Sequence, residues 1–170
     1  MTISMYDAAV PVFRRLLANL AEILERAEAW AGERGIEERV LLEARLYPDM
    51  FPLVRQVQIA ADVATRGVDR LAGRKVSRVE DTETSLAELV TRLREAIVYL
   101  DGFKPAEFDG AEARPVTLEL RGRTVDFEGL PYLLNFVTPN VYFHVTTAYD
   151  ILRHNGLEIG KRDFLGDISG

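Results

Sequence analysis

Apolar side chains recur every three or four positions along four long stretches of the chain, and this spacing predicts four amphipathic helices. The stretches cover residues 4–31, 50–72, 85–103 and 131–156. The third carries the most regular apolar stripe, which runs from Leu86 to Phe103. A glycine lies at or next to the end of each stretch, as is typical of helix C-termini.

The starts of these helices carry weaker signals. Ser4 and Ser85 each precede an acidic residue by three positions, which is the spacing of an N-terminal capping pair. Pro11 is expected either to kink the first helix or to mark the position where this helix truly begins. Residues 36–49 form a connector that includes a predicted short helix. Asp49 is expected to cap the second helix, or else the surrounding YPDMFP segment forms the rim of a pocket.

The pattern changes after the third helix. Residues 116–127, VTLELRGRTVDF, alternate apolar and polar side chains about a turn that contains Gly122, and this alternation predicts a β-hairpin. The tail from about residue 157 shows no period. Residues 1–170 are therefore expected to form one all-α domain, a four-helix bundle with a small β-hairpin inserted between the third and fourth helices.

Composition and charge narrow the class of protein. The chain is 48% hydrophobic and 28% charged, has a net charge of −6 and contains no cysteine. Its basic residues are scattered along the sequence, so we expect neither nucleic acid nor a membrane as partner. No signal-peptide pattern and no membrane-spanning apolar run are present, so we expect a cytoplasmic protein. Disulfides, thiol nucleophiles and cysteine metal sites are excluded.

Both histidines lie in PNVYFHVTTAYDILRHNG, residues 139–156. Asn140 and His144 are four residues apart, so they share one helix face in the spacing of a metal-binding histidine pair. A neutral amide is nevertheless a poor ligand for zinc or nickel. His154 lies about 15 Å farther along the helix axis, at a helix end that favours a cation. We expect His154 at the surface, whereas His144 is either a half-buried structural residue or a pocket residue.

Two glutamines in the second helix are further candidates. Helical spacing places Gln56 at the edge of the buried face and Gln58 farther out. Such glutamines more often bury a hydrogen bond than perform chemistry. The chain has no glycine-rich phosphate loop, no GxSxG motif and no HExxH motif, so the common enzyme signatures are absent.

Several segments together resemble a known family across nearly the full chain. They are ARLYPDMFPLVRQVQIAAD, EDTETSLAEL, YFHVTTAYDILRHNG and GKRDFLG. The family is an uncharacterised bacterial one in the DinB/YfiT-like superfamily of metalloenzymes. The resemblance implies a DinB-like four-helix bundle that is often dimeric. Active superfamily members hold a divalent metal with three histidines, and they include thiol-dependent S-transferases, a maleylpyruvate isomerase and hydrolase-like proteins.

In that superfamily one histidine comes from the second helix and an HxxxH pair comes from the fourth. When the sequences are matched at Gly156, the pair falls on Asn140 and His144, and the remaining histidine falls on Gln56 or Gln58. The resemblance therefore implies a degenerate metal site, because amides stand at two of its three positions. We expect no cofactor, or at most a weak divalent metal for which His144 is the only remaining ligand.

Two functions follow as hypotheses. The leading one is a homodimeric DinB-like protein with a small-molecule-binding or structural pocket lined by Gln56, Gln58, Asn140 and His144. The alternative is a metal-dependent transferase or hydrolase-like enzyme acting on a small thiol or organic substrate, with the histidine as base or ligand. Trp30 and the hairpin are candidate surfaces for contact with a partner.

Overall fold

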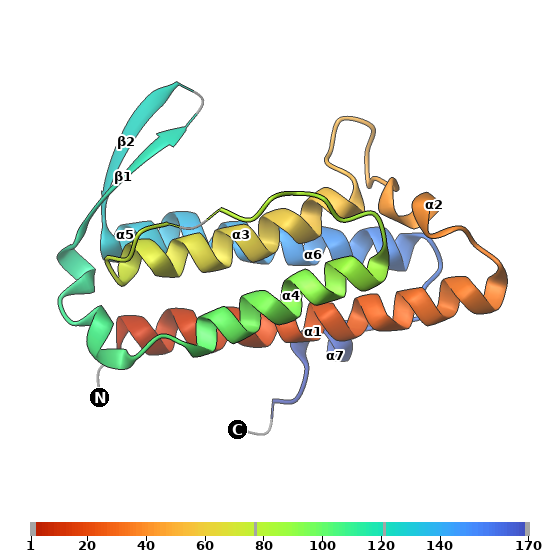
Figure 1. Cartoon of the computed structure of the whole chain (residues 1–170), viewed down its shortest axis with the longest axis horizontal. Coiled ribbons are helices and arrows are strands. Elements are labelled where there is room, and N and C mark those ends of the chain that lie inside the picture. The colour runs from red at the N-terminus through yellow and green to blue at the C-terminus, as the bar shows by residue number, and fades with distance from the viewer. Residues whose placement is uncertain (1–2, 77, 121, 169–170) are drawn as a thin grey trace.

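Four long helices lie side by side in an elongated bundle, as the computed structural model of the chain shows (Figure 1). The structure describes residues 3–76, 78–120 and 122–168. The long helices are α1 (Met5–Arg34), α3 (Leu53–Leu71), α4 (Leu86–Asp101) and α6 (Thr138–His154). The predicted bundle with an inserted hairpin is confirmed.

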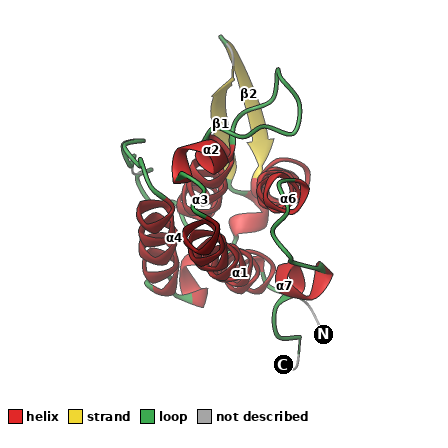
Figure 2. Ribbon diagram, turned by 90° about the vertical axis from the view of Figure 1, so that its right-hand side faces the viewer, coloured by secondary structure: helices red, strands yellow, loops and turns green. Residues whose placement is uncertain are grey.

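The helices pack chiefly in two pairs, α1 beside α4 and α3 beside α6 (Figure 2). Helices α3 and α4 run in the same direction, so the chain must return along the bundle between them (Figure 1). This return, residues 74–76 and 78–85, is called the strap below. Helix α2 (Glu38–Leu42) lies in the connector between α1 and α3 and confirms the short helix predicted there.

The apolar stripes that predicted the helices form the core. Fully buried side chains include Phe13, Leu17, Leu20 and Leu24 of α1 and Leu86, Leu89, Leu93 and Leu100 of α4. Each buried methylene group stabilises the fold by about 0.8 kcal/mol, so these stripes supply most of the bundle's stability. Within the described ranges, no helix combines the length and the apolar character needed to cross a membrane.

Three boundaries differ from the prediction. Helix α1 continues to Arg34 and ends at Gly35, whose φ of 63° is a left-handed conformation that glycine adopts without strain. Asp49 does not cap α3, because the cap position is taken by Pro52, whose backbone is extended and whose side chain makes no capping hydrogen bond. The tail is not irregular throughout, because Lys161–Leu165 form α7.

Tertiary hydrogen bonds hold α7 against α1, and they explain why its sequence shows no period. Asn19 donates to the carbonyl oxygen of Phe164 at 2.9 Å, and the Arg26 guanidinium lies 2.5 Å from the Asp163 carboxylate. Asp163 also accepts from the backbone N–H of Gly160 at 2.6 Å. A five-residue helix is unstable on its own, so these contacts decide its conformation.

The fourth predicted helix is continuous but not uniform. Helix α5 (Gly129–Tyr132) leads into the π-helical turn η3 (Leu133–Val137), and α6 follows directly. Pro139 has no backbone N–H to donate into the preceding turn, and its ring crowds that turn. The wider π-helical turn accommodates this proline. Gly67 of α3 packs here, because a Cβ on it would lie 2.5 Å from a Val137 methyl carbon.

The hairpin confirms its prediction. Strands β1 (Pro115–Leu120) and β2 (Arg123–Glu128) pair antiparallel, with Val116 opposite Phe127 and Leu118 opposite Val125. Val116 and Leu118 are buried, and the outer end of the hairpin projects beyond the helices (Figure 1). The apolar face of the hairpin therefore packs on the bundle, as an isolated two-stranded sheet requires.

Candidate functional site

Gln56 and His144 meet between α3 and α6. The distance from Gln56 Oε1 to His144 Nδ1 is 2.7 Å, and both residues are buried. The amide nitrogen of Gln56 donates to the carbonyl oxygen of Phe51 at 3.0 Å, which directs the amide oxygen toward the ring. The hydrogen-bond network thus assigns the proton to Nδ1 of His144, which donates to Gln56.

The electrostatic environment keeps His144 neutral. Burial lowers the pKa of His144, and the positive charge of Arg55 lowers it further. A histidine with a lowered pKa is uncharged at neutral pH. Nε2 therefore carries the lone pair, and no hydrogen bond to Nε2 is found among the residues that the structure describes. The ring can accept a hydrogen bond or act as a base through this atom.

The other two predicted site residues point elsewhere. The Asn140 side chain donates to the carbonyl oxygen of Phe136 in its own helix, at 2.7 Å. Gln58 donates to the Glu83 carboxylate at 2.8 Å and accepts from Arg55 at 3.3 Å. The structure therefore brings together Gln56 and His144 and does not join Gln58 or Asn140 to them. The sequence left open which glutamine faces the histidine, and the structure identifies Gln56.

Candidate metal ligands do not cluster in the described ranges, where no group of three His, Cys, Asp or Glu side chains could hold an ion. The donors that meet are one amide oxygen and one imidazole, which fit zinc or nickel poorly. His154 is exposed in the last turn of α6. The expectation of at most a weak metal site stands as a prediction.

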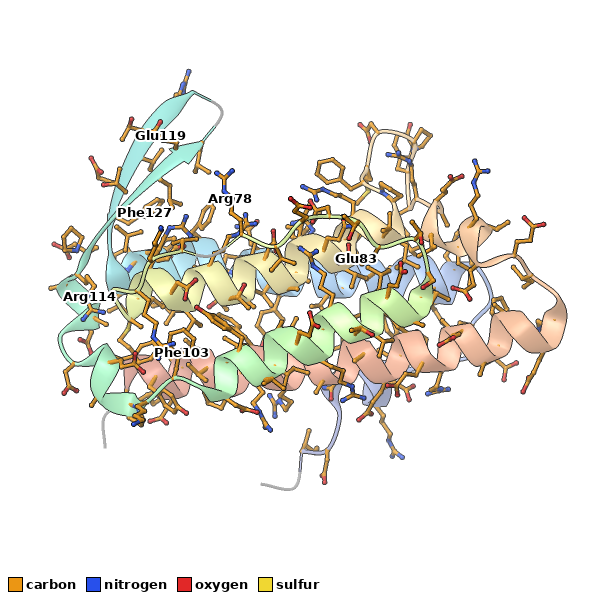
Figure 3. All side chains as sticks on the ribbon, viewed as in Figure 1. Arg78, Glu83, Phe103, Arg114, Glu119 and Phe127 are labelled. Atoms are coloured by element: carbon orange, nitrogen blue, oxygen red, sulfur yellow. The ribbon has the colours of Figure 1, made fainter. Side chains whose placement is uncertain are left out.

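A buried ionic cluster surrounds Arg92 of α4, and no pattern in the sequence indicated it. The Arg92 side chain is only 4% exposed and lies 2.7 Å from both Asp62 and Glu83 and 3.0 Å from Asp81. It also donates to the carbonyl oxygen of Glu80 at 2.9 Å. These contacts join α3, α4 and the strap, and Figure 3 shows Glu83 of the strap beside α3 and α4. Gln58 binds Glu83 and so belongs to this cluster.

A cleft between α3 and the hairpin was also missed. It has a volume of about 280 Å³ and is bordered by α3, β1, Tyr132 and Phe136. Three arginines of α3 line it, Arg55, Arg66 and Arg70. Their spacing of eleven and four residues places them near one stripe of a helix, so the sequence did contain a signal. This signal was not recognised, because basic residues are scattered over the whole sequence.

The bundle, the inserted hairpin and the α6 histidine facing α3 define a DinB-like protein. A crystal structure of a DinB family member protein from Shewanella denitrificans superimposes with a TM-score of 0.90. It is 42% identical over 98% of this chain and 94% of that chain. The family described as "Domain of unknown function (DUF1993)" matches residues 5–165, and the chain belongs to it. The resemblance seen in the sequence is thus confirmed, and no curated protein matches the chain.

Proposed function

We propose that this protein is a cytoplasmic small-molecule-binding protein in which the Gln56–His144 hydrogen bond occupies the place of a degenerate metal site. The contact of 2.7 Å between Gln56 Oε1 and His144 Nδ1 carries the proposal. One amide and one imidazole supply too few strong donors to hold zinc or nickel tightly. The same hydrogen bond fixes the ring, so that Nε2 is positioned to accept a hydrogen bond from a ligand.

Metal analysis tests this proposal. Protein equilibrated with zinc or nickel and then desalted should retain far less than one ion per chain, as measured by elemental analysis. His144→Ala and the surface control His154→Ala should give the same result as the wild type. Near-stoichiometric metal that disappears in His144→Ala alone would contradict the proposal and favour the metal-dependent enzyme.

We also propose that the protein is a homodimer whose copies meet through the exposed face of α5, η3 and α6. Residues 129–149 contain no Asp, Glu, Lys or Arg, and their exposed side chains include Leu130, Leu134, Tyr142 and Phe143. Two chains of charge −6 repel each other, so an uncharged apolar face is where they can approach. Trp30 is a weaker candidate, because the Arg34 guanidinium lies over its ring at 5.2 Å.

A charge placed on this face should prevent dimer formation. Leu134 is 55% exposed, so Leu134→Arg should leave the fold intact but bury an unpaired cation in the dimer. We expect a monomer by size-exclusion chromatography with light scattering, whereas the wild type gives a dimer. The control is Val98→Arg on α4, at a position 71% exposed, which should remain dimeric. A wild-type monomer, or a dimeric Leu134→Arg, would contradict the proposal.

A further inference from the structure

We infer that the cleft between α3 and the hairpin binds a small monocarboxylate whose body is apolar and about the size of one ring. This inference goes beyond the proposed function, because it assigns a second site, away from Nε2 of His144, and the class of ligand that it takes. It does not depend on the state of the metal position, because Gln56 and His144 do not line this cleft.

The three arginines are not equally engaged. Arg55 pairs with Asp81 of the strap, and Arg66 pairs with Asp62 at 2.6 Å in its own helix. Arg70 donates to the carbonyl oxygen of Arg66 at 3.1 Å and lies 3.5 Å from the Tyr132 hydroxyl. Among the described residues, no carboxylate lies within ion-pair distance of Arg70. It is therefore the cation in the cleft that has no internal counter-charge.

Arg70 is suited to recognise a carboxylate. The hydrogen bonds of Arg70 to Arg66 and Tyr132 both use one terminal nitrogen, Nη1, so Nη2 and Nε retain donors. A guanidinium presents such donors in a planar fork that matches the two oxygens of a carboxylate. The contact with Tyr132 limits the freedom of the side chain, so less conformational entropy is lost when a ligand binds.

Part of the cleft wall is apolar. Tyr132 and Phe136 stack with ring centroids 5.7 Å apart, and Phe127 of β2 lies 5.8 Å and 6.0 Å from them. Figure 3 shows Phe127 at the base of the hairpin, where it meets the helices. Leu118 and Leu120 of β1 also line the cleft. An aromatic or branched apolar group fits between these surfaces.

Charge and size limit the ligand further. Two of the three arginines in the lining are already paired with carboxylates, so one positive charge, that of Arg70, is left without a carboxylate partner among the described residues. A monoanion neutralises this charge, whereas a dianion such as a phosphate ester exceeds it. The volume of about 280 Å³ lies at the lower end for ligand sites. A single-ring carboxylate therefore suits the cleft better than a nucleotide or a peptide.

Calorimetric titration with three probes tests the inference. Phenylacetate carries both the charge and the ring, phenylacetamide lacks the charge, and acetate lacks the ring. Phenylacetate should bind the wild-type protein at least about tenfold more tightly than either of the others. Its binding should shift the NMR signals of Tyr132 and Phe136. Failure of phenylacetate to bind, or equal binding of phenylacetamide, would overturn the inference.

Variants locate the binding. Arg70→Gln should weaken phenylacetate binding about tenfold or more, and Glu119→Gln should strengthen it about twofold by removing a negative charge from the cleft. The control is Arg39→Gln on α2, whose side chain is 78% exposed, and it should bind as the wild type does. Unchanged melting temperatures would show that the variants are folded. If a neutral ligand binds and is insensitive to Arg70→Gln, this inference fails while small-molecule binding stands.

Discussion

The double variant Gln56→His with Asn140→His should bind one zinc ion per chain, with an affinity at least roughly 10³-fold higher than that of the wild type. Position 56 on α3 faces His144 on α6 across the interface of the two helices, and Gln56 Oε1 lies 2.7 Å from His144 Nδ1. Position 140 lies one helical turn before His144 and so shares its face. Three imidazoles would then converge, which is a ligand set that zinc prefers. Competition with a chromogenic chelator measures the affinity.

The chain offers a matched control for this experiment. Gln58→His combined with Asn140→His introduces the same two histidines, but residue 58 points to the strap, where it contacts Glu83 at 2.8 Å. This variant should bind zinc no more tightly than the wild type. Equal zinc binding by both double variants would show that α3 does not present Gln56 to α6 as described. That outcome would also remove the support for a degenerate metal site.

Replacing Arg92 should produce the largest loss of stability among the charged residues of the bundle. Arg92→Met leaves Asp62, Asp81 and Glu83 near one another without their shared cation. Removal of one partner from a buried ionic cluster costs roughly 3–5 kcal/mol. We expect about 3 kcal/mol, because Arg66 and Arg55 still pair with two of the three carboxylates. Urea unfolding followed by circular dichroism measures the change in the free energy of unfolding.

The same helix supplies the control for Arg92. Arg94→Met removes an exposed arginine that pairs with Glu25 at 3.0 Å, and it should change the free energy of unfolding by less than about 1 kcal/mol. A similar loss in both variants would mean that the buried cluster adds nothing beyond a surface ion pair.

The pH dependence of stability gives an independent check. Burial by itself would raise the pKa of Glu83, but hydrogen bonds from Arg92 and Gln58 lower it below its ordinary value. A carboxyl group with a lowered pKa in the folded state stabilises the fold above its unfolded pKa of about 4.3 and loses this effect as the pH falls through the folded value. Wild-type stability should therefore fall in acid. The decline should be shallower in Arg92→Met, whose Glu83 lacks the arginine.

The fold could be predicted because its signals are local. The apolar stripe from Leu86 to Phe103 predicts α4 without knowledge of its neighbours, and the backbone N–H of Glu88 donates to the Ser85 side chain as predicted, at 3.1 Å. Helix α7 could not be predicted, because contacts from Asn19 and Arg26, more than 130 residues away, stabilise it. The residue type of Asp49 favours a cap, but Pro52, nearer the helix, occupies the cap position.

The candidate site was predictable only in part. The spacing of Asn140 and His144 is a local signal, but the choice between Gln56 and Gln58 depends on how α3 is rotated against α6. That rotation is decided by packing across the whole interface. The ionic cluster around Arg92 is a second non-local feature, because Arg92 contacts residues up to 30 positions away in sequence. The sequence pattern alone does not reveal which of the many acidic residues surround it.

The pairing of the helices has a consequence for how the chain folds. Helices that are neighbours in sequence form neither of the two main packing pairs, since α1 lies beside α4 and α3 lies beside α6. The core therefore cannot be assembled from helical hairpins that form one after another. Folding must close long loops before the principal contacts form, and such non-local topologies fold more slowly than bundles with sequential pairs. We therefore expect the return of the strap along the bundle to slow folding as well as to support the fold.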